Sequence, residues 1–528
     1  MGSRTNLIAV IAAVYLTAFI TLTSAAASVK VEGGLVEGTL ESGITAYKGI
    51  PFAAPPVGSL RWRPPQPVKN WDGVLKADKY APACPQIQFY IPIFPKVETS
   101  EDCLYLNVWT PAQSPAENLP VMVWIYGGGF VMGATSMPLY SGEQLAKMGV
   151  IVVGIAYRVG PLGFLAHPDL TAESPRRVSG NYGLLDQIAG LRWVQRNIKA
   201  FGGDPDRVTI FGESAGGISV SMLAASPLAK GLFHRAICQS GGSFHPVRKE
   251  KEPDSIQLLA GAEAAGVAFA QRTGANSLAE LRRISPEKLL NHPTVRAAGF
   301  WPIVDGYVIV DDQYKLYEAG QYNDVPVLVG TNSDEGSMFA QATTPEQYEK
   351  GARERFGPFA EKVLALYPGQ TPDQTFRAAA DILRDALFGW PTWSWARLQS
   401  KAGTSKVYVY YFDQKLPLSA SSLFFKSNDA PHGSEMPYVF RHLDQIPATL
   451  YAGDDRKLSE TMATYWTNFA KKGNPNGEGL PQWPVFKDPE PTVMYLDSTP
   501  HTGPVPNMDK LTVLDEYFAW KRTSGPGQ

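Results

Sequence analysis

The sequence has almost no net charge: 48 lysines and arginines against 50 aspartates and glutamates give −2 at pH 7 over 528 residues. Because the positive and negative charges are so evenly balanced, the composition indicates no basic surface for nucleic acid or for an anionic membrane. Neither is expected as a partner. The chain also lacks any Asn-x-Ser/Thr sequon, so N-glycosylation is not expected. Beyond the N-terminus, no apolar run reaches membrane-spanning length. No Ser/Gly linker or internal repeat divides the chain.

The first 27 residues have the pattern of a secretory signal. Arg4 provides the positive start, and residues 7–22 are mostly apolar but short and interrupted by threonine. Small residues at 24–27 allow cleavage near Ala27. The pattern predicts a signal peptide over residues 1–27 and a secreted or periplasmic protein, with an uncleaved anchor as the alternative. The missing sequons favour a bacterial origin.

Cysteine is scarce, with three residues in the whole chain. Cys84 and Cys103 could form one disulfide around residues 85–102, which would stabilise the fold by about 3 kcal/mol through loop-closure entropy. Cys238 follows the apolar run 233–237. We expect it to be a buried thiol and not a nucleophile.

The composition, 44% apolar and 19% charged, is that of a globular protein with a large core. Residues 30–80 are rich in proline and glycine turns, which favours extended chain. Apolar runs predict buried strands, and helical periodicity follows several of them. The predicted strands are 103–111, 120–126, 150–157, 208–211, 326–329 and 407–412, and the predicted helices 181–201, 218–225, 458–469 and 508–520. This alternation predicts an α/β fold with a mostly parallel sheet, as one domain with insertions over residues 28–528.

Residues 208–217 combine a strand, a tight turn and a helix around the motif Gly212-Glu213-Ser214-Ala215-Gly216. In this context Ser214 is expected at the tip of a strained turn, with its Oγ clear of the backbone. Gly212 and Gly216 occupy places where a Cβ would collide with neighbouring chain. The N–H groups of the following helix would face a developing oxyanion. A plain turn carrying a solvated serine is the alternative.

A nucleophilic serine needs a histidine base and a carboxylate that orients it. In a strand–turn–helix serine hydrolase the chain order is serine, acid, histidine, which leaves three of the seven histidines. His432 lies in a Pro-His-Gly turn after the strand 407–412 and is the expected base. His442 is interpreted as a surface or packing residue in a candidate helical stretch, 436–443, and His501 as part of a solvated turn.

The acid should follow a strand and precede His432. Asp334 and Glu335 come directly after the strand 326–329, and spacing alone does not separate them. Asp305 is a weaker candidate, because Asp-Gly is first of all a turn signal.

Three glycines, 127–129, follow the buried strand 120–126. Successive glycine N–H groups can converge on one oxygen without obstruction by side chains. Together with the N–H of Ala215 they would form an oxyanion hole with three donors. A flexible glycine turn is the alternative, but the preceding strand and the following Phe130 argue against it.

Over roughly residues 30–520, the chain resembles the type-B carboxylesterase/cholinesterase family of the α/β-hydrolases. The motifs that carry the resemblance are Glu101–Asn107, Trp124–Phe130, Ala156–Phe164, Gly180–Gln187, Asn197–Pro205, Phe211–Gly217 and Phe233–Gly241. The resemblance implies an α/β-hydrolase fold with Ser214 as nucleophile, His432 as base and Glu335 rather than Asp334 as acid. It further implies supporting roles for particular residues: oxyanion donors Gly128, Gly129 and Ala215, a Cys84–Cys103 disulfide, and Glu213 and Ser240 beside the triad. Glu213 could instead be only a helix-start carboxylate.

Two positions depart from the family pattern. Tyr126 stands where many members have histidine before the glycines, as in some cholinesterase-like members. Cholinesterases carry a choline-stacking tryptophan in the first disulfide loop, but residues 85–102 contain none, so choline esters are not expected as substrates. The aromatic and apolar stretch 89–94 in that loop could be simple packing or an apolar rim of the pocket.

These observations predict a secreted serine carboxylic-ester hydrolase that forms an acyl-enzyme on Ser214 and needs no metal or cofactor. The expected partner is a small-molecule ester with apolar groups, while the oligomeric state and the natural ester stay open. Because His432 must be neutral, activity should fall as the pH drops through about 6 to 7. The alternatives are a lipase, amidase or acyltransferase, or a non-catalytic binding protein on the same scaffold; the retained Ser214, Glu335 and His432 argue against the last.

Overall fold

The computed structural model describes residues 28–87, 96–249, 252, 255–291, 300–416, 429–445, 451 and 453–524. Two of the predictions, the signal peptide over 1–27 and the role of the stretch 89–94, lie outside these residues. The division into a leader and one domain stays a prediction.

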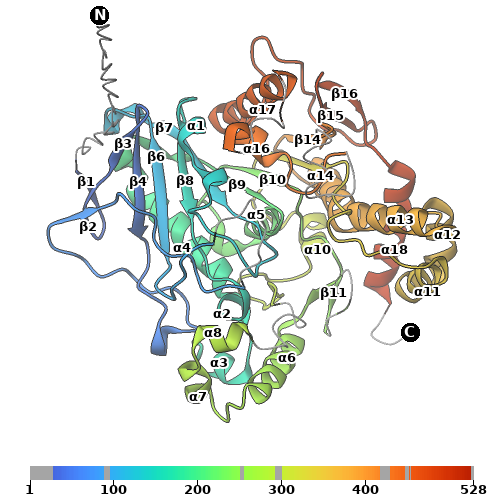
Figure 1. The fold of residues 1–528 in the computed structure, drawn as a ribbon, viewed down its shortest axis with the longest axis horizontal. Helices are drawn as coiled ribbons and strands as arrows, with labels where there is room; N and C mark the ends of the chain where they lie inside the picture. Colours follow the sequence, from blue (N-terminus) through green and yellow to red (C-terminus); the bar gives the residue numbers. More distant parts are fainter. Residues whose placement is uncertain are drawn as a thin grey trace, which may run out of the picture.

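A mixed sheet of eleven strands, counted over the described residues, forms the centre of the molecule (Figure 1). Its strands, in spatial order, are β16 (His501–Pro504), β15 (Thr492–Leu496), β14 (Val407–Phe412), β13 (Val327–Asn332), β10 (Arg235–Gln239), β9 (Gly203–Glu213), β7 (Leu119–Ile125), β8 (Ile151–Ile155), β6 (Tyr105–Thr110), β4 (Ile44–Pro51) and β3 (Thr39–Glu41). The strands from β15 to β8 run parallel, whereas both edges pair antiparallel. The predicted α/β fold with a mostly parallel sheet is therefore confirmed.

The central strands are the apolar runs expected from the sequence. All five residues of β8 and all six of β13 are buried, which is typical of parallel strands covered on both faces. A smaller sheet of β1 (Val29–Val31), β2 (Gly34–Glu37) and β5 (Val74–Lys76) uses the proline- and glycine-rich N-terminal region. The extended chain predicted there is thus present.

Helices cover both faces of the sheet. The helix α5 (Ala215–Ala225) packs on β9, β10 and β7, and α17 (Gly453–Lys472) packs on β7 and β9. On β10, the thiol of Cys238 approaches the carbonyl of Gly217 in α5, while the next side chain, Gln239, bonds Trp466 of α17. Because adjacent strand residues point to opposite faces, these two helices lie on opposite sides of the sheet.

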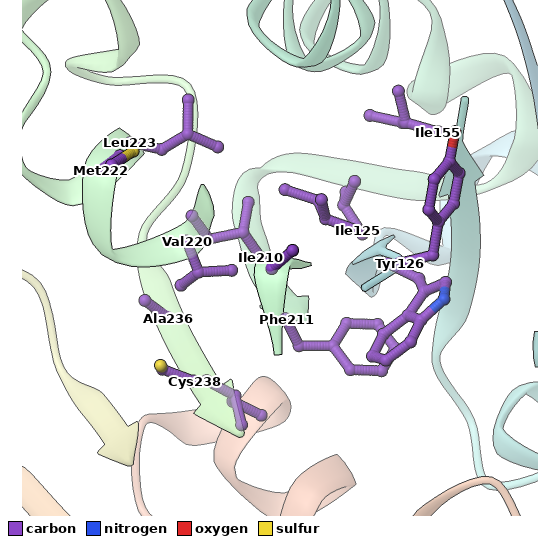
Figure 2. Close-up of a cluster of buried hydrophobic side chains, with 14 of the residues drawn as sticks. Ile125, Tyr126, Ile155, Ile210, Phe211, Val220, Met222, Leu223, Ala236 and Cys238 are labelled. Atoms are coloured by element: carbon purple, nitrogen blue, oxygen red, sulfur yellow. The ribbon is translucent and has the colours of Figure 1, made fainter. Parts of the chain in front are cut away.

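The core beneath the serine turn is apolar on each face of β9 (Figure 2). Ile210 lies toward Val220 of α5, and Phe211 packs against Trp124 and Phe440 at ring-centroid distances of 4.9 and 5.7 Å. Cys238 is 1% exposed and forms no disulfide, as predicted.

Some elements differ from the sequence predictions. The helix expected from residue 218 begins at Ala215, and the helix expected over 181–201 is α4 (Tyr182–Asn197) followed by a 3₁₀ turn over Ile198–Phe201. The stretch 436–443 is helical only in α16 (Met436–Val439). Strands β10 and β15–β16 were not predicted, nor were the helices α11 (Pro345–Phe356), α12 (Ala360–Leu366), α13 (Pro372–Arg384) and α14 (Trp390–Ala402).

Within the described residues, the structure contains no helix with the length and apolar character needed to cross a bilayer.

Candidate active site

Ser214 occupies the turn between β9 and α5 with φ 55° and ψ −124°. A non-glycine residue rarely adopts a positive φ, so the turn stores strain that the surrounding structure must hold. The backbone around it is fixed: the N–H of Ser214 donates to the carbonyl of Gln239 at 2.9 Å, and its own carbonyl accepts the N–H of Ile218 at 2.8 Å. The side chain remains half-buried and not enclosed in the core.

The glycines beside Ser214 are required by close packing. A Cβ on Gly216 would lie 2.0 Å from the carbonyl oxygen of Ile125, and a Cβ on Gly212 would lie 2.5 Å from the backbone of Gly216. Neither approach leaves room for a side chain. The steric reason predicted for the two glycines is therefore present in the structure.

His432 lies between two buried carboxylates. Its Nδ1 is 2.6 Å from Oε2 of Glu335, and its Nε2 is 3.2 Å from Oε1 of Glu213, the residue before Ser214. The loop that carries His432 is joined to the end of β13 by a backbone bridge between Asp334 and Pro431. Residues more than 200 positions apart in the chain thus meet at the carboxyl ends of β9 and β13.

Glu335 is held by donors on its other oxygen. Its Oε1 accepts the hydroxyl of Ser240 at 2.5 Å and the backbone N–H of Asn332 at 2.7 Å. Glu335 is 0% exposed, so its hydrogen bonds to Ser240, Asn332 and His432 are all shielded from water. Ser240, at the end of β10, therefore lies beside the candidate triad, where the resemblance implied it.

A second layer of buried polar residues was not predicted. Glu435 is 0% exposed and accepts from Nε2 of Gln239 at 2.9 Å and from Nδ2 of Asn332 at 2.7 Å. The Oε1 of Gln239 in turn accepts the indole N–H of Trp466. The sequence offered only the positions of these residues as a signal that they lie near the site. Asn332 ends an apolar strand, and Glu435 follows His432 by three residues.

The other candidate acids and histidines form hydrogen bonds with groups other than the imidazole of His432. The backbone N–H of Asp334 donates to the carbonyl of Ala430, and Oδ1 of Asp305 accepts three backbone N–H groups in a turn. The buried His442 faces the carbonyl of Ser141 at 2.9 Å, which fits a packing role. His501 is exposed but begins strand β16, so the solvated turn expected there is wrong.

The buried charges perturb one another. Burial raises the pKa of Glu213 to about 8, and the carboxylates of Glu435 and Glu335 add to this increase, whereas His432 opposes it. Burial lowers the pKa of His432, but the charges of Glu213 and Glu335 and the hydrogen bond that the imidazole donates to Glu335 outweigh it and raise the pKa to about 9. The sequence analysis expected activity to fall as the pH drops through about 6 to 7, which assumed an imidazole with an unperturbed pKa. In this site the raised pKa of His432 moves the expected loss of activity to higher pH.

The glycine segment after β7 packs on the serine turn. A Cβ on Gly127 would lie 3.0 Å from the Cβ of Ser214. Gly128 and Gly129 have φ of +103° and +62°, a succession of positive values open mainly to glycine. Within the described part of the chain, the N–H groups of Gly128, Gly129 and Ala215 have no hydrogen-bond acceptor. Three donors near Ser214 are thus unengaged.

Aromatic side chains border the imidazole. The ring of Phe388 lies 4.7 Å and that of Phe339 5.3 Å from the ring of His432, centroid to centroid. Phe339 is 44% exposed and its neighbour Met338 is 49% exposed. The accessible side of the site therefore presents apolar surface.

No group of three or more histidine, cysteine, aspartate or glutamate side chains arranged to hold a metal ion occurs in the ranges that the structure describes.

A serine at a strand–turn–helix elbow, on the central parallel strands of a mixed sheet covered by helices on both faces, defines the α/β-hydrolase class. A model of the carboxylesterase family matches residues 25–513, and the chain belongs to this family.

Curated relatives agree with this assignment. Para-nitrobenzyl esterase of Bacillus subtilis (strain 168) is 39% identical over 492 residues, covering 88% of this chain and 94% of the relative. Fumonisin B1 esterase of Sphingopyxis macrogoltabida is 37% identical over 480 residues, covering 86% and 84%. Human cocaine esterase is 37% identical over 494 residues, covering 88% and 85%.

Solved structures show the same relationship. A PNB esterase superposes with a TM-score of 0.79 and a thermophilic PNB esterase with 0.81, each at 37% identity, covering 92% of this chain and 99% of the other. The chain is therefore a carboxylesterase, an enzyme whose substrate is a small-molecule ester.

Proposed function

We propose that the chain is a secreted serine carboxylic-ester hydrolase in which Ser214 is the nucleophile, His432 the base and Glu335 the acid. The observation that carries the proposal is the 2.6 Å contact between Nδ1 of His432 and Oε2 of Glu335. This contact leaves Nε2 directed toward Glu213, whose chain neighbour is Ser214. A base oriented in this way can take the proton of a serine hydroxyl.

In the proposed reaction, Oγ of Ser214 attacks the ester carbonyl as Nε2 of His432 accepts the hydroxyl proton. The oxyanion of the tetrahedral intermediate accepts hydrogen bonds from the N–H groups of Gly128, Gly129 and Ala215. His432 then gives its proton to the leaving alcohol, and an acyl-enzyme remains. Water, deprotonated by His432, attacks the acyl carbon, and the acid leaves as Ser214 recovers its proton. The anionic Glu335 stabilises the imidazolium in both halves.

The apolar border of the site supports esters with apolar groups. Phe339 and Phe388 lie against the imidazole, where part of an ester bound to Ser214 would come close to them. The three curated relatives are named for three different substrates, so the acyl preference has to be measured. A panel of p-nitrophenyl esters of increasing acyl length is expected to give a kcat/KM that rises from acetyl to longer chains.

The proposed triad is tested with Ser214→Ala. We expect ester turnover, the p-nitrophenol burst and fluorophosphonate labelling to be lost, while the circular dichroism spectrum stays that of the wild type. A Ser214→Ala protein that still forms an acyl-enzyme would overturn the proposal. The matched control is Ser219→Ala, a buried serine on α5 whose Oγ accepts a hydrogen bond from Gln187, and it should retain the burst.

Secretion is part of the proposal and has its own test. The chain from Met1 is expressed with its leader, and the mature N-terminus of exported protein is sequenced. We expect it to begin at Ser28, after the small residues that end at Ala27. A protein retained in the cell with residues 1–27 attached would overturn this part.

A further inference from the structure

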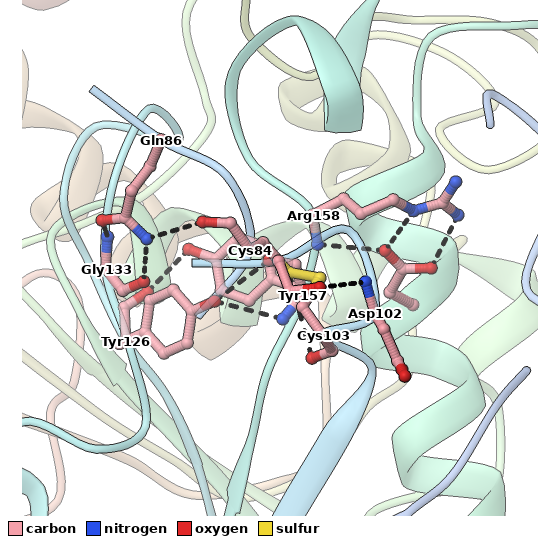
Figure 3. The surroundings of a disulfide bond; sticks show 10 residues. Cys84, Gln86, Asp102, Cys103, Tyr126, Gly133, Tyr157 and Arg158 are labelled. Carbon is pink, nitrogen blue, oxygen red and sulfur yellow. Dashed lines mark hydrogen bonds and ion pairs between the residues drawn. A yellow bond between two sulfur atoms is a disulfide. The ribbon is translucent and has the colours of Figure 1, made fainter. Parts of the chain in front are cut away.

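The glycine segment 127–133 must hold two N–H groups in a fixed place if the proposed oxyanion hole is to work. Its preceding end is fixed through Tyr126, which stacks on Tyr157 with 4.4 Å between ring centroids. The hydroxyl of Tyr126 accepts the N–H of Tyr157 and donates to its carbonyl, and the hydroxyl of Tyr157 donates to the carbonyl of Tyr126 (Figure 3). These contacts fix only one end of the segment.

The other end is held by a single side chain. The N–H of Gly133 donates to Oε1 of Gln86 at 2.9 Å, and Nε2 of Gln86 donates to the carbonyl of Gly133 at 2.8 Å (Figure 3). The amide of Gln86 thus pairs with one residue of the main chain in both directions, as a neighbouring strand would. Among the described residues, Gln86 is the hydrogen-bond partner of both backbone groups of Gly133.

The segment between these ends is a closed turn. The carbonyl of Gly128 accepts the N–H groups of Val131 and Met132, both at 3.1 Å. A Cβ on Gly133 would lie 2.3 Å from the ring of Tyr126 and 2.8 Å from the carbonyl oxygen of Gly127, so the two ends of the turn are in contact. A displacement of Gly133 is therefore transmitted to the peptides of Gly128 and Gly129.

Gln86 is itself fixed by the disulfide. Its Nε2 also donates to the carbonyl of Cys84 at 3.0 Å, and Cys84 is bonded to Cys103, two residues before β6. Gln86 is 9% exposed, and each of its amide atoms has a partner. The disulfide and Gln86 thus link the Gly133 end of the segment to the chain that leads into β6, in addition to the direct connection of the segment to β7 and the hydrogen bond from the N–H of Gly160 to the carbonyl of Phe130.

We propose that Gln86 is a positioning residue for the oxyanion hole, holding the segment 127–133 in the geometry that directs the N–H groups of Gly128 and Gly129 at the reacting oxygen. The inference rests on the proposed function of those two glycines. It assigns a catalytic consequence to the first disulfide loop, which otherwise is only a structural closure.

The test compares Gln86→Glu with Gln86→Met, both close to the native side chain in volume. Glutamate keeps an acceptor for Gly133 but sets an oxygen against two carbonyls, and methionine removes every hydrogen bond. We expect kcat for p-nitrophenyl esters to fall by about 10- to 100-fold in either variant, because small displacements of catalytic groups have effects of this size. KM should change by less than about 3-fold, because these donors act in the transition state.

A merely structural role would lower thermal stability without weakening recognition of the transition state. The second readout is therefore the inhibition constant of a trifluoromethyl ketone, which forms a tetrahedral adduct with an oxyanion. We expect this constant to rise in parallel with the loss of kcat. Wild-type kcat and wild-type inhibition by the ketone in both variants would overturn the inference.

Gln195→Glu is the matched control. Gln195 is half-buried and its Nε2 donates to two backbone carbonyls, of Pro205 and Leu232, but it touches no part of the glycine segment. This variant should keep kcat and the inhibition constant even where it lowers the melting temperature. An equal loss of kcat in Gln195→Glu would overturn the inference.

One measurement needs no variant. Amide hydrogen exchange of the wild-type protein should show the N–H of Gly133 protected, and free-peptide exchange there would overturn the inference. Failure of the proposed function gives a different result: in that case Ser214→Ala keeps turnover, whereas here Ser214→Ala is inactive whatever the Gln86 variants do.

Discussion

Oε1 of Glu213 lies 3.2 Å from Nε2 of His432, on the side of the imidazole opposite Glu335. Glu213 is 3% exposed, and within the described residues this oxygen has no hydrogen-bond partner. An acceptor in such a place interacts with the imidazole mainly through its charge. We therefore expect Glu213 to act on the proton affinity of the candidate base, and the proposed acid Glu335 to hold the ring in place.

The first prediction concerns the acid limb of the pH–rate profile. The pKa of His432 is raised to about 9, and the base works only when neutral, so kcat/KM should be lost as the pH falls through a value above the ordinary 6.5. Glu213→Gln removes the charge that contributes most to this increase. We expect the limb to move to lower pH in the variant, measured by acid release in a pH-stat between pH 5 and 10.

Glu435→Gln is the control for the first prediction. Glu435 is equally buried, but its carboxylate bonds Gln239 and Asn332 and raises the pKa of His432 less than Glu213 does. The acid limb of the pH–rate profile should therefore move less in Glu435→Gln than in Glu213→Gln. A limb that stays in place in Glu213→Gln, or that moves to higher pH, contradicts the account of Glu213 given above.

The second prediction separates the two neighbouring acids. Glu335→Gln should lower kcat by at least about 100-fold, because an amide at Oε2 no longer fixes the tautomer of His432 or stabilises the imidazolium. Asp334→Asn should leave kcat within about 3-fold, because the structure shows Glu335 at Nδ1 and the backbone of Asp334 paired with Ala430. Steady-state kinetics on one p-nitrophenyl ester decide the matter, and the reverse order of losses would assign the acid to Asp334.

The sequence alone does not distinguish Asp334 from Glu335 as the acid, because the choice depends on the direction of each side chain. Both follow an apolar strand, so periodicity places both at the right edge of the sheet. The choice depends on the bridge of Asp334 to Pro431, a contact between residues almost 100 positions apart that local pattern does not encode. The resemblance to the family supplied the preference for Glu335, and the residues themselves did not.

Other parts of the fold were predictable in proportion to their apolar content. The strands β7, β8 and β14 are buried apolar runs, and each was predicted close to its bounds. Strand β13 runs on to Asn332, beyond the predicted end at 329, and β9 already begins at Gly203, in a polar stretch before the predicted start at 208. Strand β10 was missed because it begins with Arg235 and ends with Gln239, whose polar side chain is buried by a bond to Trp466. The buried Asn332 and Glu435 were missed for the same reason, since a polar residue in a sequence favours the surface until its partner is known.

The third prediction tests the glycine segment directly. Gly128 has φ +103°, and a Cβ there would lie 2.4 Å from the carbonyl oxygen of Met132, so Gly128→Ala must displace the turn. We expect kcat to fall by about 100-fold or more, the size of loss found when one oxyanion donor is removed. The trifluoromethyl ketone should lose affinity in parallel.

Gly351→Ala serves as its control. Gly351 lies in α11, and an added Cβ there meets no atom within 4 Å beyond the neighbouring backbone of its own helix, so alanine should leave kcat unchanged and stabilise the helix by about 0.5–1 kcal/mol. The prediction fails if Gly128→Ala keeps wild-type kcat.

The last prediction concerns Asn332, which joins the strand before the proposed acid, Glu335, to the loop of the proposed base, His432. Its backbone N–H donates to Glu335, and its Nδ2 donates to the carbonyl of Pro431 at 2.9 Å and to Oε2 of Glu435 at 2.7 Å. Asn332→Asp keeps the shape but sets an oxygen against both acceptors, one of them a buried carboxylate. We expect the free energy of unfolding to fall by about 3 kcal/mol at pH 8, the scale for an uncompensated buried charge.

The same substitution should also lower kcat, because Pro431 precedes His432 and the loop loses its attachment to β13. The matched variant is Asn323→Asp, whose Nδ2 likewise donates to two backbone carbonyls, of Leu223 and Ser226, with neither acceptor in the candidate site. Asn323→Asp should lower the free energy of unfolding by a smaller amount, about 1–2 kcal/mol, and leave kcat unchanged. Urea unfolding and kcat measured on the two variants side by side give the comparison. Equal losses of stability and of kcat in both would mean that Asn332 is an ordinary buried amide with no special link to the base.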